Sequence, residues 1–387
     1  MVDLTSKDSL RNKIAIGVSV VSIAVLALMV IVSLQQRRSI QWMASDGAHA
    51  SPFPKIELVK RLNLGNLVST VAWSPDGRYF ATSEYGDKIV RIWDAKTWRQ
   101  LHVIEKKTIG SGDMSFLNDG KTLVVSSTQL GDDFSALTLI DAPSGKIVRQ
   151  VDGPNQIDGP HGWPMANQPQ RYLLSADGSL LFLDALGKKG DGGIYVYETR
   201  DWVVLKHWKP DWGVTSMVAG RTPGELMTTD VHDMLQVWNV FEGRLVREFP
   251  VSPSIVRFLR FDNIRGLIFA GETGMTLWRR GVKDEFPSVE RGVQIRNFKT
   301  GEKVSAIQAN LPILGLDVSP DLFVVSDADR RIAMYRTSNM SKVAELQNFG
   351  PFARATRFSA DGQFLAVAGG KKVLIFSVWV SHENGRD

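Results

Sequence analysis

The side chains most often used in catalysis and metal binding are sparse in this chain and do not cluster in its sequence. There is no cysteine, which excludes disulfides, thiolate metal sites and haem attachment through Cys-x-x-Cys-His. The six histidines show no His-x-His or His-x-x-x-His spacing: His49, His102, His161, His207, His232 and His382. Because a zinc site requires three or four converging ligands, we expect no metal, no cofactor and no catalytic residue.

Motifs that bind phosphate or activate a nucleophile are missing as well. Residues 190–193 read Gly-Asp-Gly-Gly, but no strand-to-helix pattern surrounds them, so we interpret them as a flexible turn. No P-loop and no Gly-x-Ser-x-Gly elbow occurs. The recurrent acids Asp87, Asp233 and Asp329 are interpreted as structural residues that accept hydrogen bonds from turn N–H groups between strands.

The elements that would position any site recur as a unit of about 40 residues. In the clearest copy, residues 71–94, an apolar strand runs into Ser-Pro-Asp-Gly, a second strand follows, and a third ends in Trp93-Asp94. Asp-Gly between apolar runs is a strong hairpin signal. Similar turns occur at Asn118-Asp119-Gly120, Ser175-Ala176-Asp177-Gly178, Ser319-Pro320-Asp321 and Ser359-Ala360-Asp361-Gly362. We count seven copies.

A fourth strand follows every third strand except in the last copy, which ends soon after Val378. A spare strand, residues 56–62, precedes the first copy and is expected to complete the last blade. Such closure pairs the two terminal edges and removes exposed strands. The sequence therefore predicts an all-β, seven-bladed β-propeller over residues 55–380.

These residues resemble the WD-repeat family, and the resemblance covers roughly residues 55–380. Trp93-Asp94 is a literal Trp-Asp pair, and Trp238-Asn239 is a close variant. We interpret Trp93 and Trp238 as structural strand residues. Related YVTN and quinoprotein-dehydrogenase-like propellers share the strand pattern and stay open as relatives. A ring of such blades is a platform, which favours binding over chemistry.

The N-terminal region carries a membrane signal. Residues 14–34 are an uninterrupted run without charge, long enough to span a hydrocarbon layer of about 30 Å at about 1.5 Å per residue. We predict one transmembrane helix, a signal anchor, after a short tail of residues 1–13. Cleavage at Ala48-His49-Ala50 is disfavoured because the triplet lies far beyond the apolar run. Residues 35–54 are read as a linker and residues 381–387 as a C-terminal tail.

The charge distribution bears on orientation and on partners. Lys7, Arg11 and Lys13 precede the apolar run, and Arg37 and Arg38 follow it. This difference favours a cytoplasmic N-terminus with the propeller outside the cytoplasm, in the periplasm of a Gram-negative bacterium. The net charge of +5 is small and dispersed, whereas nucleic-acid proteins gather positive charge into a patch. We therefore expect no nucleic-acid partner.

Three long stretches interrupt the repeats: residues 152–170, 187–193 and 272–292. In a WD-type blade, the turn between the second and third strands lies on the same rim as the link between blades. We therefore expect the three stretches to build up one face of the ring. Long segments on a rigid scaffold are where binding residues concentrate.

The residues proposed to bind a partner lie within these stretches. Trp163, Trp278, Arg279 and Arg280 are of the types enriched at interface hot spots. His161 stands close to Trp163 in the sequence and is a candidate ligand or base, although a surface histidine is the commoner role. The alternative interpretation is that the tryptophans only pack the stretches against the ring.

Three functions are compatible with this sequence. The leading one is a membrane-tethered, non-enzymatic scaffold or assembly factor that binds another protein. The second is an extracytoplasmic enzyme or redox protein of the quinoprotein-dehydrogenase type, for which cofactor-attachment residues are missing. The third is a small-ligand sensor that uses the centre of the ring. Polar residues converging at the centre would favour a ligand, and small apolar residues a scaffold.

Overall fold

The computed structural model describes residues 41–44, 54–85, 89–105, 113–126, 137–151, 171–185, 193–211, 213–251, 255–272 and 292–380. These residues form strands β1 to β29, joined by turns. The chain divides into two compact units, of which one comprises Trp42–Leu346 and Gly350–Asp387 and the other Met1–Gln41 with Gln347–Phe349. The ring described below is the first of these units.

Seven antiparallel sheets make up the ring, and each is one blade. Blade 1 is β3 (Val68–Trp73), β4 (Tyr79–Glu84), β5 (Ile89–Asp94) and β6 (Gln100–Glu105); blade 2 is β7 (Met114–Phe116), β8 (Thr122–Ser126), β9 (Leu137–Asp141) and β10 (Lys146–Val151). Blade 3 is β11 (Arg171–Leu174), β12 (Leu180–Ala185), β13 (Gly193–Glu198) and β14 (Val204–Trp208); blade 4 is β15 (Val214–Ala219), β16 (Glu225–Asp230), β17 (Met234–Asn239) and β18 (Arg244–Pro250).

The remaining blades follow the same order. Blade 5 is β19 (Val256–Asp262), β20 (Leu267–Glu272), β21 (Gly292–Asn297) and β22 (Lys303–Gln308). Blade 6 is β23 (Ile313–Val318), β24 (Leu322–Asp327), β25 (Ile332–Arg336) and β26 (Lys342–Gln347), with β1 (Gln41–Ala44) beyond β26. Blade 7 is β27 (Ala355–Phe358), β28 (Phe364–Gly369), β29 (Lys372–Trp379) and β2 (Lys55–Asn63).

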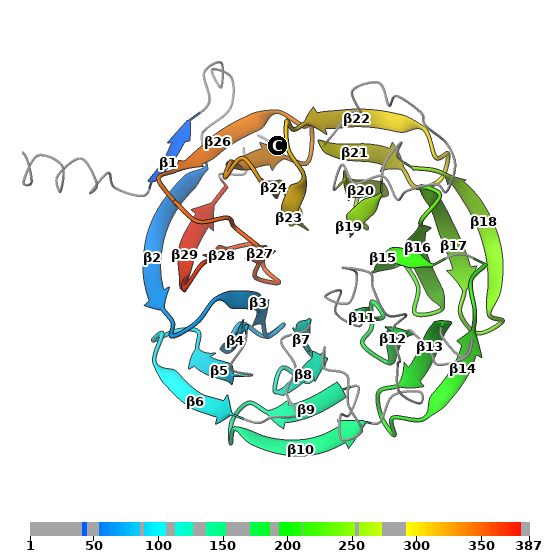
Figure 1. The fold of residues 1–387 in the computed structure, drawn as a ribbon, viewed down its shortest axis with the longest axis horizontal. Coiled ribbons are helices and arrows are strands. Elements are labelled where there is room, and N and C mark those ends of the chain that lie inside the picture. Colours follow the sequence, from blue (N-terminus) through cyan, green and yellow to red (C-terminus); the bar gives the residue numbers. More distant parts are fainter. Residues whose placement is uncertain are drawn as a thin grey trace, which may run out of the picture. The chain divides into compact units, whose positions relative to one another are not determined.

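The first strand of every blade lies innermost, next to the axis of the ring, as Figure 1 shows for β3, β7, β11, β15, β19, β23 and β27. Neighbouring first strands contact one another in the order β11, β15, β19, β23, β27, β3 and β7. The arrangement confirms the prediction of an all-β, seven-bladed propeller.

The predicted closure of the ring is confirmed. β2 pairs with β29 from Lys55↔Trp379 to Asn63↔Lys372, so the early strand supplies the fourth strand of blade 7. Aromatic rings then join blades 7 and 1, because Phe364 stacks on Trp73 with 5.9 Å between ring centroids. The outer edge of β29 is therefore paired, as the closing of the ring requires.

The core lies between blades, where each sheet packs on its two neighbours. Second strands are covered on both faces and read as near-continuous apolar runs, unlike half-exposed strands. Their aromatic side chains Phe80, Phe182, Phe269 and Phe323 have no exposed surface. Burying each contributes about 1.5–3 kcal/mol. The blades are therefore held together mainly by apolar contact around the second strands.

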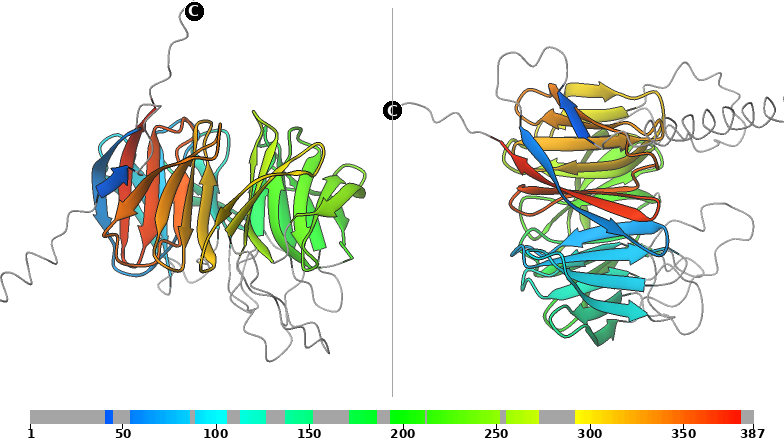
Figure 2. Two further views of the ribbon diagram at one scale, coloured as in Figure 1. Left: turned by 90° about the horizontal axis from the view of Figure 1, so that it is seen from above. Right: turned by 90° about the vertical axis from the view of Figure 1, so that its left-hand side faces the viewer.

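The strands of each blade run between two rims (Figure 2). At the turn rim, tight turns join the first strand to the second and the third to the fourth, and all of them lie in the described residues. At the long-segment rim, first strands begin and second strands end, as the pairs Val68↔Glu84 and Val256↔Glu272 show. Every stretch outside the described part between Pro54 and Val380 separates two strand ends of this second rim, the longest being residues 127–136, 152–170 and 273–291.

The predicted transmembrane helix, residues 14–34, lies outside the described residues, as do the short tail 1–13, most of the linker 35–54 and the tail 381–387. Within the described ranges, no helix has the length and apolar character needed to cross a membrane.

Candidate functional site

The residues predicted to bind a partner all lie outside the described part of the chain: His161, Trp163, Trp278, Arg279 and Arg280. The strand ends on either side of them are described. Val151 ends β10 and Arg171 begins β11, while Glu272 ends β20 and Gly292 begins β21. All four ends lie at the long-segment rim, so the expectation that these stretches start and finish on one face agrees with the strand order.

Two third strands that follow long stretches begin with a glycine that no other residue could replace without strain. Gly193 has φ 148° and Gly292 has φ 150°, values that L side chains rarely adopt. A Cβ would collide with the carbonyl oxygen of Trp208 at Gly193 and with that of Ile307 at Gly292. The backbone at these points is thus fixed by close approach to the neighbouring fourth strand. This gives residues 186–192 and 273–291 a defined point of return to the ring.

The predicted turn acids lie beside other acids that accept turn hydrogen bonds. Asp87 lies outside the described residues, and Asp233 and Asp329 lie in turns as predicted. In both turns, an acid two or three residues earlier accepts from backbone N–H groups. Asp230 Oδ1 accepts from His232 N at 2.8 Å and from Met234 N at 3.0 Å. Asp327 Oδ1 accepts from Asp329 N at 2.9 Å and from Arg331 N at 3.0 Å. The accepting acid ends the second strand, because only there does its carboxylate face the N–H groups of the turn.

A buried acid stands at this position in four blades. Glu84, Asp230, Glu272 and Asp327 each end a second strand, opposite the first residue of the innermost strand, and at most 5% of any of them is exposed. Burial raises the pKa of Asp327 above its usual range. The carboxylate of Glu84 accepts from Asn66 N at 2.8 Å and pairs with Arg91 at 2.5 Å. This row of acids, which sequence reasoning missed, fixes the base of the long-segment rim. The signal was an acid at the same place in four repeats.

The two predicted structural tryptophans hold third strands to second strands. Trp93 Nε1 donates to Thr82 Oγ1 at 3.2 Å, and Trp238 Nε1 donates to Thr228 Oγ1 at 2.9 Å. In blade 4 the contacts continue through Gln236, whose Nε2 donates to Asp230 Oδ2 at 3.3 Å. These polar groups are buried, and each has a partner, which is the condition for keeping them in a core.

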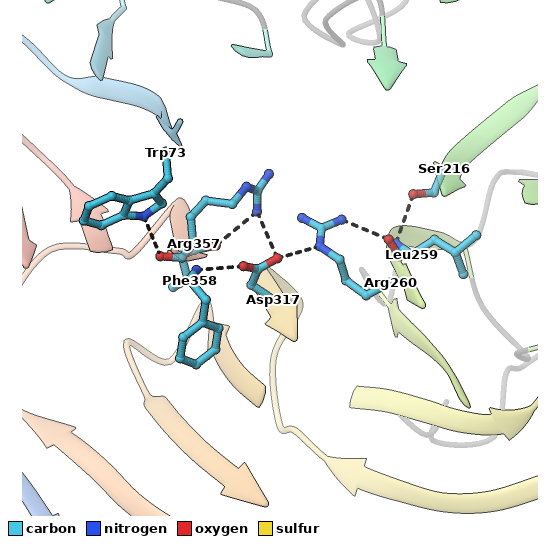
Figure 3. A network of polar contacts seen from close by, with 8 residues as sticks. Trp73, Ser216, Leu259, Arg260, Asp317, Arg357 and Phe358 are labelled. Carbon is cyan, nitrogen blue, oxygen red and sulfur yellow. Dashed lines mark hydrogen bonds and ion pairs between the residues drawn. The ribbon is translucent and has the colours of Figure 1, made fainter. Parts of the chain in front are cut away.

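Polar contacts also join the blades at the axis (Figure 3). Ser216 Oγ in blade 4 donates to Arg257 O at 3.2 Å and accepts from Leu259 N at 3.1 Å, both in blade 5. Blades 2 and 3 are joined by Tyr172, whose hydroxyl donates to Val124 O at 2.7 Å and accepts from Ser115 Oγ at 3.1 Å. Burial raises the pKa of Tyr172 far above its usual value, so the hydroxyl stays a donor.

Asp317 is the centre of the axial contacts in blades 5, 6 and 7. Arg260 Nε donates to its Oδ1 at 2.9 Å, and Phe358 N donates to its Oδ2 at 2.8 Å. Arg357 approaches the same carboxylate with 4.0 Å between its nitrogen and Oδ1. Figure 3 shows the two guanidinium groups on either side of Asp317. Trp73 Nε1 in blade 1 donates to Arg357 O at 3.1 Å and carries the contacts on to the next blade.

Positive charge dominates this axial region. Burial, and after it the charge of Arg260, lowers the pKa of Arg357, although Asp317 opposes the shift. Arg257 is exposed, yet desolvation by surrounding protein lowers its pKa, followed by the charge of Arg354. Exposure and desolvation agree if the side chain is open to water in one direction only. The innermost strands therefore bring together charged groups rather than small apolar ones.

Comparison with known proteins gives one family match. Residues 58–94 match the WD domain, G-beta repeat, a span that runs from within β2 to the end of β5. A comparison with curated proteins finds no match. Among the described residues, no group of three or more His, Cys, Asp or Glu side chains could hold a metal ion.

Proposed function

Because the chain belongs to the WD-repeat propellers, we propose that it is a membrane-tethered scaffold or assembly factor that binds another protein through its long-segment rim. WD-repeat propellers generally act as scaffolds that bind other proteins, which supports this proposal. One observation carries the choice of face: the two longest connections between strands, from Val151 to Arg171 and from Glu272 to Gly292, start and end at that rim. The turn rim offers only tight turns.

The rim suits recognition because its strand ends are fixed. Buried acids end four second strands, and Gly193 and Gly292 fix the return of two stretches to the ring. Segments anchored on such a base lose less conformational freedom on binding than segments on a mobile base. We assign the partner contacts to Trp163, Trp278, Arg279 and Arg280, with His161 beside them.

The tether in this proposal is the apolar run 14–34, with residues 35–54 as linker. A tether confines the propeller near the membrane and raises its effective concentration toward a partner there. In this proposal the N-terminus lies in the cytoplasm and the propeller on the other side of the membrane, because more positive residues precede the run than follow it.

Partner binding is tested by capture from native membranes in mild detergent, followed by mass spectrometry. The full chain is compared with a variant in which residues 273–291 are replaced by a short Gly-Asn turn, and with Arg279→Ala/Arg280→Ala. The matched control is Arg244→Ala, an exposed residue of the turn rim. We expect a stoichiometric partner that both rim variants lose and the control keeps. Equal capture by all four proteins would reject the assigned face.

Orientation is tested by using the absence of cysteine. Lys96→Cys places one thiol on an exposed turn of blade 1, against no background. We expect a membrane-impermeant maleimide to label this thiol in intact cells whose outer membrane has been permeabilised. Labelling only after lysis would put the propeller in the cytoplasm, and release of the chain from membranes by carbonate would reject the tether.

A further inference from the structure

Two arginines with the same spacing stand at the innermost strand of blade 5 and at that of blade 7. Arg257 and Arg260 lie on β19; Arg357 lies on β27, and Arg354 directly precedes it. Strand β23 lies between them in the ring and contributes Asp317. The four arginines thus form two pairs. One is Arg260 with Arg357; the other is Arg257 with Arg354, three residues earlier in each blade and therefore nearer the long-segment rim.

Only one of these pairs is neutralised. Arg260 and Arg357 share the carboxylate of Asp317. Arg257 and Arg354 are both exposed, and within the described ranges neither guanidinium has a hydrogen bond or an ion pair. Arg257 and Arg354 stand at the same end of β19 and β27, and both of these strands contact β23; in keeping with this placement, the charge of Arg354 adds to burial in lowering the pKa of Arg257. Two like charges in a desolvated place repel one another unless a counter-ion joins them.

Arg257 lies at a bulge in the backbone of β19. The first strands of four blades carry a one-residue bulge after their first residue, and the bulged residues are Ser69, Thr215, Arg257 and Leu314. Bulges re-aim a side chain. The carbonyl of Arg257 is held by Ser216 Oγ at 3.2 Å, and Arg354 N donates to Ala368 O at 2.9 Å. In β23, which lies between the strands of the two arginines, the bulged residue is Leu314. A leucine cannot neutralise the arginines as Asp317 neutralises the other pair.

We infer that Arg257 and Arg354 form a binding site for a small oxyanion with two negative charges, of the phosphate-ester or dicarboxylate class. A guanidinium group presents two parallel N–H donors that match the oxygens of phosphate or carboxylate. Two such groups from different blades require a ligand that carries charge toward both. The ligand would take the place that Asp317 takes for the other pair. This inference is independent of the protein-binding function proposed for the rim.

The site is tested on the purified full chain in detergent, with inorganic phosphate and succinate as probes and sodium chloride of matched ionic strength as reference. Calorimetric titration and thermal unfolding are measured for the wild type, Arg257→Gln, Arg354→Gln and the double variant. The matched control is Arg244→Gln, which removes one exposed arginine from the turn rim.

We expect saturable binding and a saturable rise in Tm for the wild type and for Arg244→Gln. Binding should weaken at least tenfold in each single variant and vanish in the double variant. In chloride alone, the double variant should unfold at the same or a higher temperature than the wild type, because removing one repulsion costs no bond. Leu314→Asp should abolish phosphate binding by supplying an internal carboxylate.

Absence of saturable binding of either probe to the wild type would overturn the inference. So would equal binding by the double variant. Partner capture is measured in parallel: if the double variant loses its partner while no protein binds phosphate or succinate, the arginines serve an acidic segment of the partner, and the small-ligand site is rejected without loss of the scaffold proposal.

Discussion

The two rims of the propeller join the same strands with different chemistry. At the turn rim, Asp94 Oδ1 accepts from Lys96 N at 3.1 Å and Thr97 N at 2.6 Å, and Asn239 and Asn297 repeat this contact in blades 4 and 5. These contacts are local and exposed. At the long-segment rim, buried acids end four second strands, and long stretches lie between the strand ends. The tight turns are thus stabilised by hydrogen bonds between their own residues, whereas the strand ends that the long stretches connect are stabilised by buried acids.

The comparison separates stability from recognition. The hydrogen bonds of the turn rim help each hairpin form, and the tight turns there offer a partner little surface to contact. The acids at the long-segment rim are buried at the ends of second strands, so we expect the ring to tolerate sequence changes in the stretches between these strand ends. We therefore expect substitutions in the buried base to cost the most and changes in the stretches to cost the least.

The largest effect is expected for Asp230→Ala. Asp230 is 2% exposed and accepts from His232 N, Met234 N and Gln236 Nε2, so its loss leaves buried donors unpaired and costs about 2–3 kcal/mol. Urea unfolding measures the change. The control Asp329→Ala removes a surface ion pair with Arg331 whose side chains are 44% and 51% exposed, and costs below about 0.5 kcal/mol. Equal losses would contradict the dominant role given to the buried Asp230.

A smaller effect is expected at the turn rim from Gly120→Ala compared with Gly77→Ala. Both glycines have φ 69°, which costs a side chain about 1–2 kcal/mol. A Cβ on Gly77 meets nothing within 4 Å, whereas one on Gly120 collides with the carboxylate of Asp76. That carboxylate is held by Ser74 Oγ at 2.7 Å and Arg78 N at 3.0 Å.

Displacing Asp76 breaks the turn of the neighbouring blade, so Gly120→Ala should lose about 1 kcal/mol more than Gly77→Ala, the value of one hydrogen bond. Paired urea titrations give the difference. Identical losses would mean that turns on adjacent blades are independent, and the turn rim would then be purely local.

Acid should weaken the turn rim. The hydrogen bond from Ser175 lowers the pKa of Asp177, and that from Thr97 lowers the pKa of Asp94. A carboxyl with a lowered folded pKa adds stability above its unfolded pKa of about 3.9, and this stability is lost as pH falls through the folded value. Asp177→Asn should therefore lower Tm at pH 6 and leave it unchanged at pH 2. A constant difference at all pH values would contradict the assignment.

The smallest effect on stability is expected when residues 273–291 are replaced by a short turn that retains Glu272 and Gly292. Each doubling of loop length changes closure entropy by only about 0.6 kcal/mol, so the free energy of unfolding should change by about 1 kcal/mol or less. Partner capture should nevertheless be lost. A loss of stability comparable with that of Asp230→Ala would show that the stretch is part of the core, contrary to the contrast between the rims.

The features that could be predicted from the sequence are those set by neighbouring residues. Asp-Gly turns and alternating apolar residues predicted seven blades, and several strands agree to the residue, including Lys146–Val151 and Lys303–Gln308. The closing strand followed from a count of unpaired fourth strands. The turns and strands depend on spacing within about ten residues, and the closing strand on the count of strands in all seven repeats.

The axial contacts could not be predicted in this way. Arg260 and Asp317 are 57 residues apart, and Trp73 and the carbonyl of Arg357 are 284 apart. Nothing local marks such partners, because they meet only when blades from different parts of the chain are placed around the axis. Asp230 and Asp327 were missed for a different reason: the pattern located each turn, while hydrogen-bond geometry decides that the acid at the end of the second strand accepts from its N–H groups.

The pairing of β2 with β29 sets a timetable for synthesis. The strand that completes blade 7 leaves the ribosome before any blade exists, and its partner, Lys372–Trp379, leaves after all the others. Throughout translation β2 is an unpaired edge, the kind of strand that seeks foreign partners. Blades 1 to 6 can form one after another, but the ring becomes a closed unit only in the last step. While the chain is being synthesised, Lys55–Asn63 must therefore be kept from pairing with other chains until β29 has emerged.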